Sequence, residues 1–171
     1  GGHRELGESP VATGPLMVLD TALGQIRMRF RPDAAPRTVE HIAALVRDGL
    51  YDGCCFYRSD TVIQFGLRKP DGTRVENPHP ALRVNETASG IVVSNARGTV
   101  GVAHWDIPDC GGSEVYINLQ TNQELDVVAG GYCVFAEVLD GDSFATMDAI
   151  AADVSTAGAK PLIRSILVTA P

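Results

Sequence analysis

Hydrophobic and polar residues alternate most clearly near the start of the chain. Over residues 25–30, QIRMRF, every second side chain is apolar, which is the period of a β-strand with one buried face. Residues 15–20, PLMVLD, form a preceding apolar run, and only the short stretch 21–24 separates the two. Two such runs joined by a short link predict a β-hairpin.

The hydrophobic spacing then lengthens to that of a helix. Apolar residues recur three or four positions apart over residues 39–46, and Pro36 suits the first helical turn. The Asp-Gly pair that follows predicts the end of this helix, because glycine readily takes the left-handed conformation found at helix ends. A second, short helix is predicted over residues 143–152, with Ser143 as its N-cap.

The rest of the pattern consists of short apolar segments that are typical of strands. They lie at residues 55–57, 62–65, 100–103, 115–119, 133–139 and 162–169, and the Pro- and Gly-containing stretch 67–80 predicts a long surface loop. Helices do not alternate regularly with strands, which argues against a doubly wound parallel sheet. We therefore expect a mainly β domain over residues 15–171, an antiparallel barrel or sandwich with two capping helices, after a flexible lead-in at residues 1–14.

Composition narrows the range of partners. The chain has 171 residues, of which 44% are hydrophobic and 20% charged, as in one globular domain. A net charge of −7 and scattered basic residues argue against nucleic acid as the main partner. No apolar stretch is long enough to span a membrane and no signal peptide is visible. The sequence does not fix the compartment, but the cytoplasm is favoured, and a monomer is expected unless the chain is part of an assembly. An organellar location stays open if a targeting segment precedes Gly1.

The four cysteines, Cys54, Cys55, Cys110 and Cys133, lack the CxxC spacing of zinc sites, and the histidines lack metal-ligand spacing. We expect no metal, no cofactor and free thiols, with Cys54 and Cys55 buried in a strand. Redox sensitivity of that adjacent pair is the alternative.

Six segments, in order and at similar spacing, resemble the cyclophilins. They are residues 35–42 (APRTVEHI), 53–58 (GCCFYR), 62–66 (VIQFG), 97–103 (RGTVGVA), 112–117 (GSEVYI), and 125–126 with 132–138 (LD and YCVFAEV). The resemblance implies a closed antiparallel eight-stranded cyclophilin-like β-barrel capped by two α-helices. It also implies peptidyl-prolyl cis–trans isomerase activity on proline-containing peptide or protein substrates, assisting protein folding.

Such an isomerase needs neither a nucleophile nor a metal. The peptide bond resists rotation with a barrier of about 18–20 kcal/mol, and a fixed cationic donor beside an apolar pocket would stabilise the twisted amide. The resemblance implies that Arg58 is this donor and that Gln64 holds the substrate backbone and orients the arginine. Judged by residue type alone, a solvated surface arginine and an exposed strand glutamine are the alternatives. The segment between the two is two residues shorter than in the family, which makes their relative placement an open question.

The implied substrate-binding residues depart from the family at most positions. They are Thr61, Val62, Ala103, His104, Glu114, Tyr116, Leu125 and Tyr132. Ala103 and Leu125 match the family. The other six stand, in that order, for a phenylalanine, a methionine, an asparagine, a glutamine, a phenylalanine and a histidine. The first phenylalanine aligns with Thr61 or falls in the shortened segment, and Trp105 is a second match for the asparagine. We expect Tyr116 to keep an aromatic wall.

Two glutamates bear on activity and inhibitor binding. The charge of Glu114 could pair with Arg58 and compete with its role. Glu124 stands where many members carry a tryptophan that contacts cyclosporin, so weak cyclosporin binding is expected. We expect altered or reduced isomerase activity. A non-catalytic module that binds proline-containing peptides and a structural subunit of a larger assembly are the alternative functions.

Overall fold

A computed structural model describes residues 15–88, 92–104 and 112–169, and the predictions for the lead-in, Trp105 and Cys110 lie outside them. Two α-helices are present, α1 (Pro36–Arg47) and α2 (Gly141–Ala157). The strands are β1 (Leu16–Thr21), β2 (Gly24–Phe30), β3 (Phe56–Ser59), β4 (Val62–Phe65), β5 (Thr99–Val102), β6 (Val115–Asn118), β7 (Val134–Val138) and β8 (Ile163–Val168). These elements agree with the strand and hairpin predictions to within a few residues.

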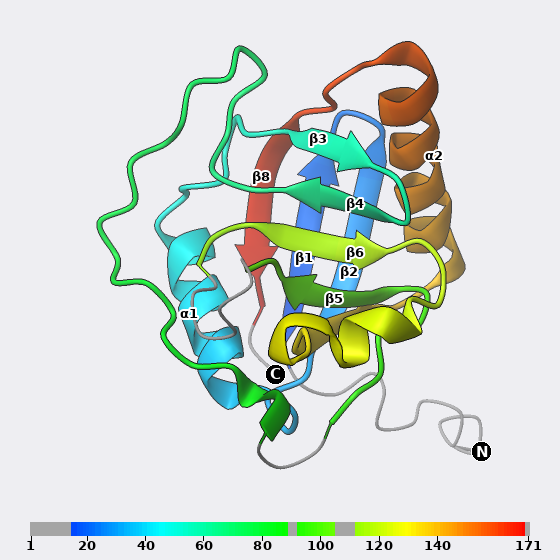
Figure 1. Cartoon of the computed structure of the whole chain (residues 1–171). Coiled ribbons are helices and arrows are strands. Elements are labelled where there is room, and N and C mark those ends of the chain that lie inside the picture. The colour runs from blue at the N-terminus through cyan, green and yellow to red at the C-terminus, as the bar shows by residue number, and fades with distance from the viewer. Residues whose placement is uncertain (1–14, 89–91, 105–111, 170–171) are drawn as a thin grey trace, which may run out of the picture.

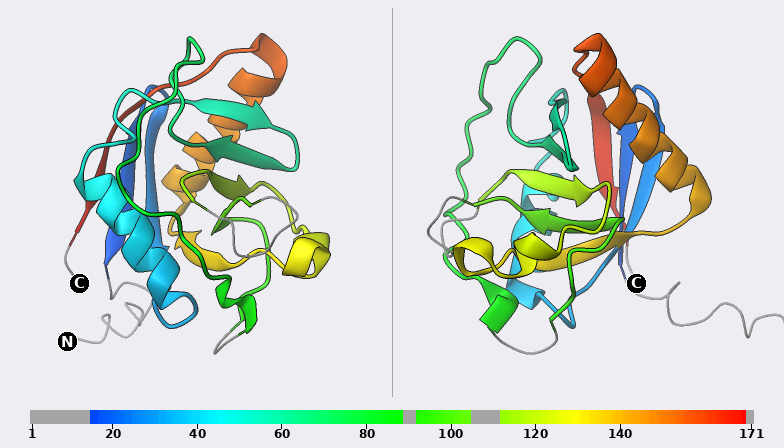
Figure 2. Two further views of the ribbon diagram at one scale, coloured as in Figure 1. Left: turned by 60° about the vertical axis from the view of Figure 1, so that its left-hand side comes forward. Right: turned by 45° about the vertical axis from the view of Figure 1, so that its right-hand side comes forward.

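All eight strands belong to one antiparallel sheet in the order β3-β4-β6-β5-β7-β2-β1-β8 (Figure 1). The two end strands meet just before each begins, where Cys55 pairs with Leu162 and the Phe56 N–H donates to the Pro161 carbonyl at 3.0 Å. The sheet thus curls into a nearly closed barrel, with α1 and α2 on opposite sides (Figures 1 and 2). This architecture confirms the predicted fold class.

The β1–β2 hairpin shows why the alternating pattern forms a barrel wall. Met17, Leu19, Ile26 and Met28 are fully buried and point into the core, whereas their neighbours along each strand face outward. Burial of apolar surface stabilises the fold by about 25 cal/mol per Å². Because apolar and polar residues alternate, one face of the hairpin is buried in this way while the other face stays in water.

Helix α1 takes its N-terminal cap from a distant part of the chain. Ala35 precedes the helix and has no capping side chain, so the first N–H groups need another acceptor. The buried Glu86 carboxylate accepts from the backbone N–H groups of Arg37 at 3.1 Å and Thr38 at 2.8 Å. At the other end Gly49 has a φ of 71°, which confirms the predicted glycine stop.

The predicted start of α2 was wrong. Asp140 is the N-cap, and its carboxylate accepts the Ser143 N–H at 2.9 Å. The Ser143 hydroxyl instead accepts the backbone N–H of Arg27 at 2.9 Å, and so joins the helix to β2. The helix also continues beyond residue 152, because no breaker occurs before Gly158. The last turn of the helix is polar, so the spacing of hydrophobic residues did not predict this continuation.

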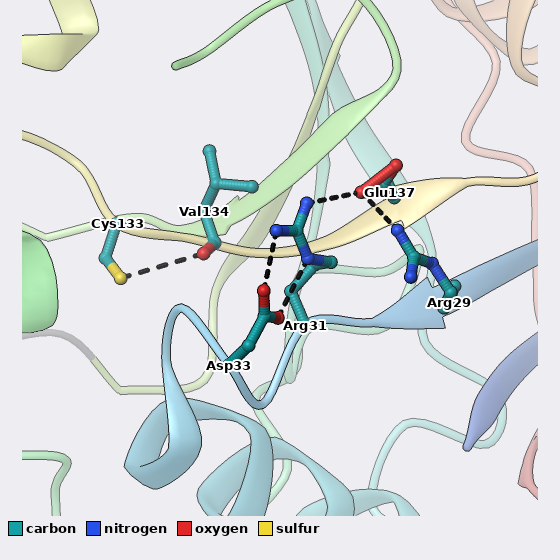
Figure 3. Close-up of polar contacts among 6 residues, drawn as sticks. All are labelled: Arg29, Arg31, Asp33, Cys133, Val134 and Glu137. Atoms are coloured by element: carbon teal, nitrogen blue, oxygen red, sulfur yellow. Dashed lines mark hydrogen bonds and ion pairs between the residues drawn. The ribbon is translucent and has the colours of Figure 1, made fainter. Parts of the chain in front are cut away.

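Four charged side chains form what we call the β2–β7 charge cluster: Arg29, Arg31, Asp33 and Glu137 (Figure 3). Arg31 and Arg29 donate to the same Glu137 oxygen at 2.8 and 3.1 Å, and Arg29 faces Glu137 directly across the two strands. Arg31 also forms a two-pronged pair with Asp33 at 2.8 and 2.9 Å. Hydrogen bonds to Asp33 and Glu137 raise the pKa of Arg31, and the Arg31 hydrogen bond lowers the pKa of Asp33. The cluster joins the two strands and the turn leading to α1.

The described cysteines are free thiols. Cys54 and Cys55 are buried, as expected, but they precede β3 and do not lie in it, and burial raises the pKa of both. Burial raises the pKa of Cys133 to about 11. Each is therefore protonated at neutral pH, in the less reactive form.

Candidate active site

A pocket of about 640 Å³ opens on the barrel wall where β3, β4 and β6 lie side by side. All ten residues named from the sequence line it: Arg58, Thr61, Val62, Gln64, Ala103, His104, Glu114, Tyr116, Leu125 and Tyr132. They come from strands and connections far apart in the sequence, so the fold has gathered the whole candidate set around one space. The role of each residue stays a prediction.

Arg58 and Gln64 are in direct contact. They are register partners on β3 and β4, and the Arg58 Nη1 group donates to the Gln64 side-chain oxygen at 2.9 Å. The short turn at residues 60–61 places them opposite each other despite the shortened segment. The Arg58 side chain is 49% exposed, so its guanidinium is held and still accessible to a ligand.

The carboxylate that pairs with Arg58 is Asp60 and not Glu114. The Arg58 Nε group donates to Asp60 at 2.8 Å within the β3–β4 turn. Burial opposes ionisation of Asp60, but hydrogen bonds from Arg58 and the Val62 N–H outweigh it and lower its pKa. The competition of Glu114 for Arg58 was therefore a wrong expectation, because Glu114 is occupied elsewhere.

Tyr57 connects Gln64 to Glu114, and sequence reasoning missed it. The Gln64 Nε2 group donates to the Tyr57 hydroxyl at 2.7 Å, and that hydroxyl donates to Glu114 at 2.5 Å. Burial and the Glu114 carboxylate raise the pKa of Tyr57, which keeps its O–H available as a donor. With the Arg58–Gln64 contact, these bonds form an unbroken chain, which we call the Arg58–Glu114 relay.

A sequence signal for this relay existed. Tyr57 takes the place of histidine in the family's Gly-x-x-Phe-His-Arg pattern, and Glu114 takes the place of glutamine. The two departures are far apart in the chain but touch in the structure.

The other end of the pocket is apolar and aromatic. Val62 is buried at its base, and Ala103 and Leu125 are partly exposed beside it. Thr61 lies exposed in the β3–β4 turn, so no bulky group fills the place of the family's pocket-floor phenylalanine. This end can take an apolar ring.

The exposed aromatic surface comes from Tyr132 and His104 more than from Tyr116. The Tyr132 and His104 rings stack with centroids 4.0 Å apart, whereas Tyr116 is only 2% exposed. The Tyr116 hydroxyl donates to the buried Asn95 side chain at 2.7 Å, which holds the ring inside the wall. The expected aromatic wall is thus present, with Tyr132 as its accessible part.

Two charged lining residues were also missed, Arg68 and Arg74. Both belong to the stretch 67–80, which is irregular as predicted. An arginine in a loop gives no sequence signal of its own, and only the fold places these two beside Glu114. Glu124 does not line the pocket, and weak cyclosporin binding remains a prediction.

Within residues 15–88, 92–104 and 112–169 there is no group of His, Cys, Asp or Glu side chains that could hold a metal ion. No helix of that same part of the chain has the length and apolar character needed to cross a membrane.

Comparison with known proteins places the chain in a family. Residues 16–170 match the family described as cyclophilin type peptidyl-prolyl cis-trans isomerase/CLD. The chain belongs to this family. Peptidyl-prolyl cis-trans isomerase cyp18 of Streptomyces antibioticus is 34% identical over 139 residues, covering 77% of this chain and 80% of that protein. Peptidyl-prolyl cis-trans isomerase B of Escherichia coli is 31% identical over 133 residues, with coverage of 74% and 79%.

Solved cyclophilins share the fold of this cyclophilin at lower sequence identity. A Cryptosporidium parvum cyclophilin type isomerase, crystallised with the dipeptide Ala-Pro, superposes with a TM-score of 0.70 at 17% identity, covering 91% of this chain and 99% of that one. A cyclophilin from Hirschia baltica gives a TM-score of 0.63 at 17% identity, covering 89% and 73%. The eight-stranded barrel is therefore kept across wide sequence divergence.

Proposed function

We propose that this cyclophilin catalyses cis–trans isomerisation of X-Pro bonds in peptide segments bound across β3 and β4, with Arg58 as the cationic donor. The observation that carries the proposal is the Arg58–Gln64 contact at 2.9 Å, beside an apolar recess. A guanidinium stays charged at any physiological pH and offers donors in a rigid fork.

Rotation about the X-Pro bond breaks the amide resonance. The nitrogen regains its lone pair as the bond twists, and a donor aimed at that nitrogen or at the carbonyl oxygen stabilises the twisted form more than either planar form. No bond is made or broken, so the residues that matter are those that hold and orient. The partly exposed Arg58 guanidinium meets this need, and the Gln64 amide keeps it in place.

The proline ring is expected to occupy the apolar end of the pocket. Val62, Leu125 and Ala103 offer apolar contact, and the stacked Tyr132 and His104 rings close one side. Proline binding is also supported by the Cryptosporidium parvum protein, whose crystal structure was obtained in the presence of the dipeptide Ala-Pro. Because Val62 and Thr61 are smaller than the family's residues, we expect a looser grip and a higher KM, at about 0.8 kcal/mol of lost contact per missing methylene.

The Arg58–Glu114 relay supports catalysis by fixing the Gln64 amide. The Tyr57 hydroxyl donates to Glu114, so its oxygen accepts from the Gln64 Nε2 group and the Gln64 oxygen is left to face Arg58. The amide cannot flip without losing both bonds. Tyr57 is thus a positioning residue for Arg58.

The test is acceleration of cis–trans exchange in a short Ala-Pro-Phe peptide, measured by exchange NMR and by a protease-coupled assay. We expect the wild type to exceed the uncatalysed rate and Arg58→Ala to lose most of that gain. The matched control is Arg164→Ala, which removes an exposed arginine on β8.

One observation favours a second reading. Asp60 holds the Nε side of Arg58 and offsets part of its charge. If the wild type binds the peptide but leaves the exchange rate at the uncatalysed value, the domain is a module that binds proline-containing peptides. Asp60→Asn would then be the variant expected to gain turnover.

A further inference from the structure

Arg68 and Arg74 face each other at the end of the pocket next to Glu114. They form an antiparallel bridge that closes a small turn, in which the Lys69 N–H donates to Thr73 and the Gly72 N–H donates to Lys69, both at 2.9 Å. Both arginines line the pocket. The turn therefore fixes two guanidinium groups at one edge of the candidate active site.

Like charges directly opposite each other destabilise a strand pair. An arrangement of this kind is favourable when an anion lies between or beside the two charges. One internal carboxylate is nearby, that of Glu114, at 3.7 Å from Arg74. Glu114 already accepts from the Tyr57 hydroxyl, the Leu67 N–H and the Ser113 hydroxyl, so its charge is largely satisfied by other donors.

Arg68 has no carboxylate partner in the described part of the chain. Its guanidinium lies 4.3 Å from the centroid of the Tyr57 ring. A guanidinium that stacks on a ring keeps its N–H edge free for a ligand. Arg58, by contrast, already pairs with Asp60.

The pocket is therefore locally positive on a protein of net charge −7. Three arginines line it, Arg58, Arg68 and Arg74. Asp60 pairs with Arg58 and Glu114 lies 3.7 Å from Arg74, so Arg68 is the lining arginine without a carboxylate partner among the described residues. Local charge of the sign opposite to the rest of the surface attracts and orients ligands of the opposite charge.

The residues along β4 give the distance between the Arg68–Arg74 end of the pocket and its apolar end. Val62, Gln64 and Gly66 succeed one another on one side of the chain, and the Glu114 carboxylate packs directly on Gly66, where an added Cβ would lie 2.0 Å from its oxygen. Four residues of extended chain span about 13 Å. A bound extended peptide with its proline near Val62 would bring a side chain two to four residues away to the arginines.

We propose that the Arg68–Arg74 end of the pocket binds an anionic side chain of the peptide substrate, two to four residues from the proline. The inference rests on the proposed function and adds a substrate class to it. A glutamate or aspartate carboxylate and a phosphorylated serine share the required chemistry, because both present oxygens that a guanidinium fork can bind in pairs.

The experiment uses peptides that differ at one position, with Glu, Gln, phosphoserine or Lys placed two, three or four residues before or after the proline. Exchange NMR gives kcat/KM and chemical-shift titration gives the affinity. For at least one position we expect kcat/KM and affinity to be about two- to fivefold higher for the Glu peptide than for the Gln peptide at low salt. Both quantities should be lower for the Lys peptide than for the Gln peptide. The difference should shrink in 0.5 M NaCl, since salt screens partly exposed charges.

The decisive variant is Arg68→Gln, in which the Glu-to-Gln ratio should fall to about one. Arg68→Lys should keep part of the preference, and Arg164→Gln, which makes the same change of net charge on β8, should keep all of it. Taking the ratio of two peptides on one variant removes any general effect of the substitution on turnover.

The outcomes separate this inference from the proposed function. If Glu and phosphoserine both match Gln at every position, the anionic subsite does not exist even though isomerisation stands. A preference for phosphoserine alone supports the subsite and assigns it to phosphorylated substrates. If no peptide is accelerated, isomerisation fails, and the affinities of the same peptides still decide whether the subsite is present.

Discussion

The β2–β7 charge cluster and the pocket both place arginines beside a glutamate, but the charges are balanced differently. In the cluster, Arg29 and Arg31 share the Glu137 carboxylate, and Arg31 has Asp33 as a second partner. The two arginine side chains are only 19% and 18% exposed. Every guanidinium there has a carboxylate partner, and little surface is left for a ligand.

In the pocket the glutamate is satisfied by other groups. Glu114 accepts from Tyr57, Ser113 and a backbone N–H, while Arg68 lies on a ring and Arg58 stays half exposed. The comparison shows that an arginine's charge and position do not reveal its role. Its partners and its accessibility do, because a guanidinium saturated by carboxylates has no donor left for a substrate.

The strongest way to break the comparison is to truncate one arginine from each region. Arg58→Ala should lower kcat/KM by about 100-fold, the usual effect of removing one transition-state donor, with little change in unfolding free energy. Arg31→Ala should do the reverse, with a lower free energy of unfolding and unchanged kcat/KM per folded molecule. Exchange NMR and urea denaturation measure the two quantities. If either variant lost both kcat/KM and unfolding free energy to a similar degree, the assignment of Arg58 to catalysis and Arg31 to stability would be wrong.

Removing the shared carboxylate tests the cluster alone. Glu137→Gln leaves Arg29 and Arg31 without a charged partner on β7, so we expect a loss of about 1–2 kcal/mol in unfolding free energy after allowing for solvent screening. The matched control is Glu76→Gln, an exposed loop glutamate, which should change stability by less than about 0.5 kcal/mol. A Glu137 variant as stable as this control would show that the cluster does not stabilise the fold.

The relay gives a smaller effect on activity. Tyr57→Phe keeps the ring but removes the hydroxyl between Gln64 and Glu114, so we expect kcat to fall about fivefold, equivalent to about 1 kcal/mol for one hydrogen bond, with KM nearly unchanged. Glu114→Gln keeps an acceptor in place and should retain most of the kcat. A rise in KM at constant kcat would instead place Tyr57 in substrate binding.

The smallest effect is a change in acid stability. The Arg31 hydrogen bond lowers the pKa of Asp33 in the folded state, so its ionised form stabilises the protein above the pKa of the unfolded chain. This contribution is lost as the pH falls through the folded-state pKa. Urea denaturation between about pH 6 and pH 2 should therefore show a steeper loss for the wild type than for Asp33→Asn. Parallel profiles would show that the ion pair adds no acid sensitivity.

The ten candidate pocket residues, in strands and in the segments that connect them, were named from the sequence because the family motifs keep residues at fixed spacing. All ten line one pocket. Tyr57, Arg68 and Arg74 could not be named in this way. Tyr57 stands out only through its contact with Glu114, and the two arginines only through the turn that brings both to the pocket. The predicted N-cap of α2 was wrong for a similar reason, because the Ser143 hydroxyl accepts a hydrogen bond from the Arg27 N–H of β2.

The sequence by itself determined the strands, the first helix and the set of motifs, because alternation, helical spacing and glycine placement act over a few neighbouring residues. The tertiary structure decided which charges neutralise each other. Electrostatic pairing depends on distances of a few ångströms between residues up to about a hundred positions apart, as for Arg29 and Glu137 or Tyr57 and Glu114. Local pattern carries no information on such distances, so the partners of each arginine, and with them its role, are set only once the barrel is folded.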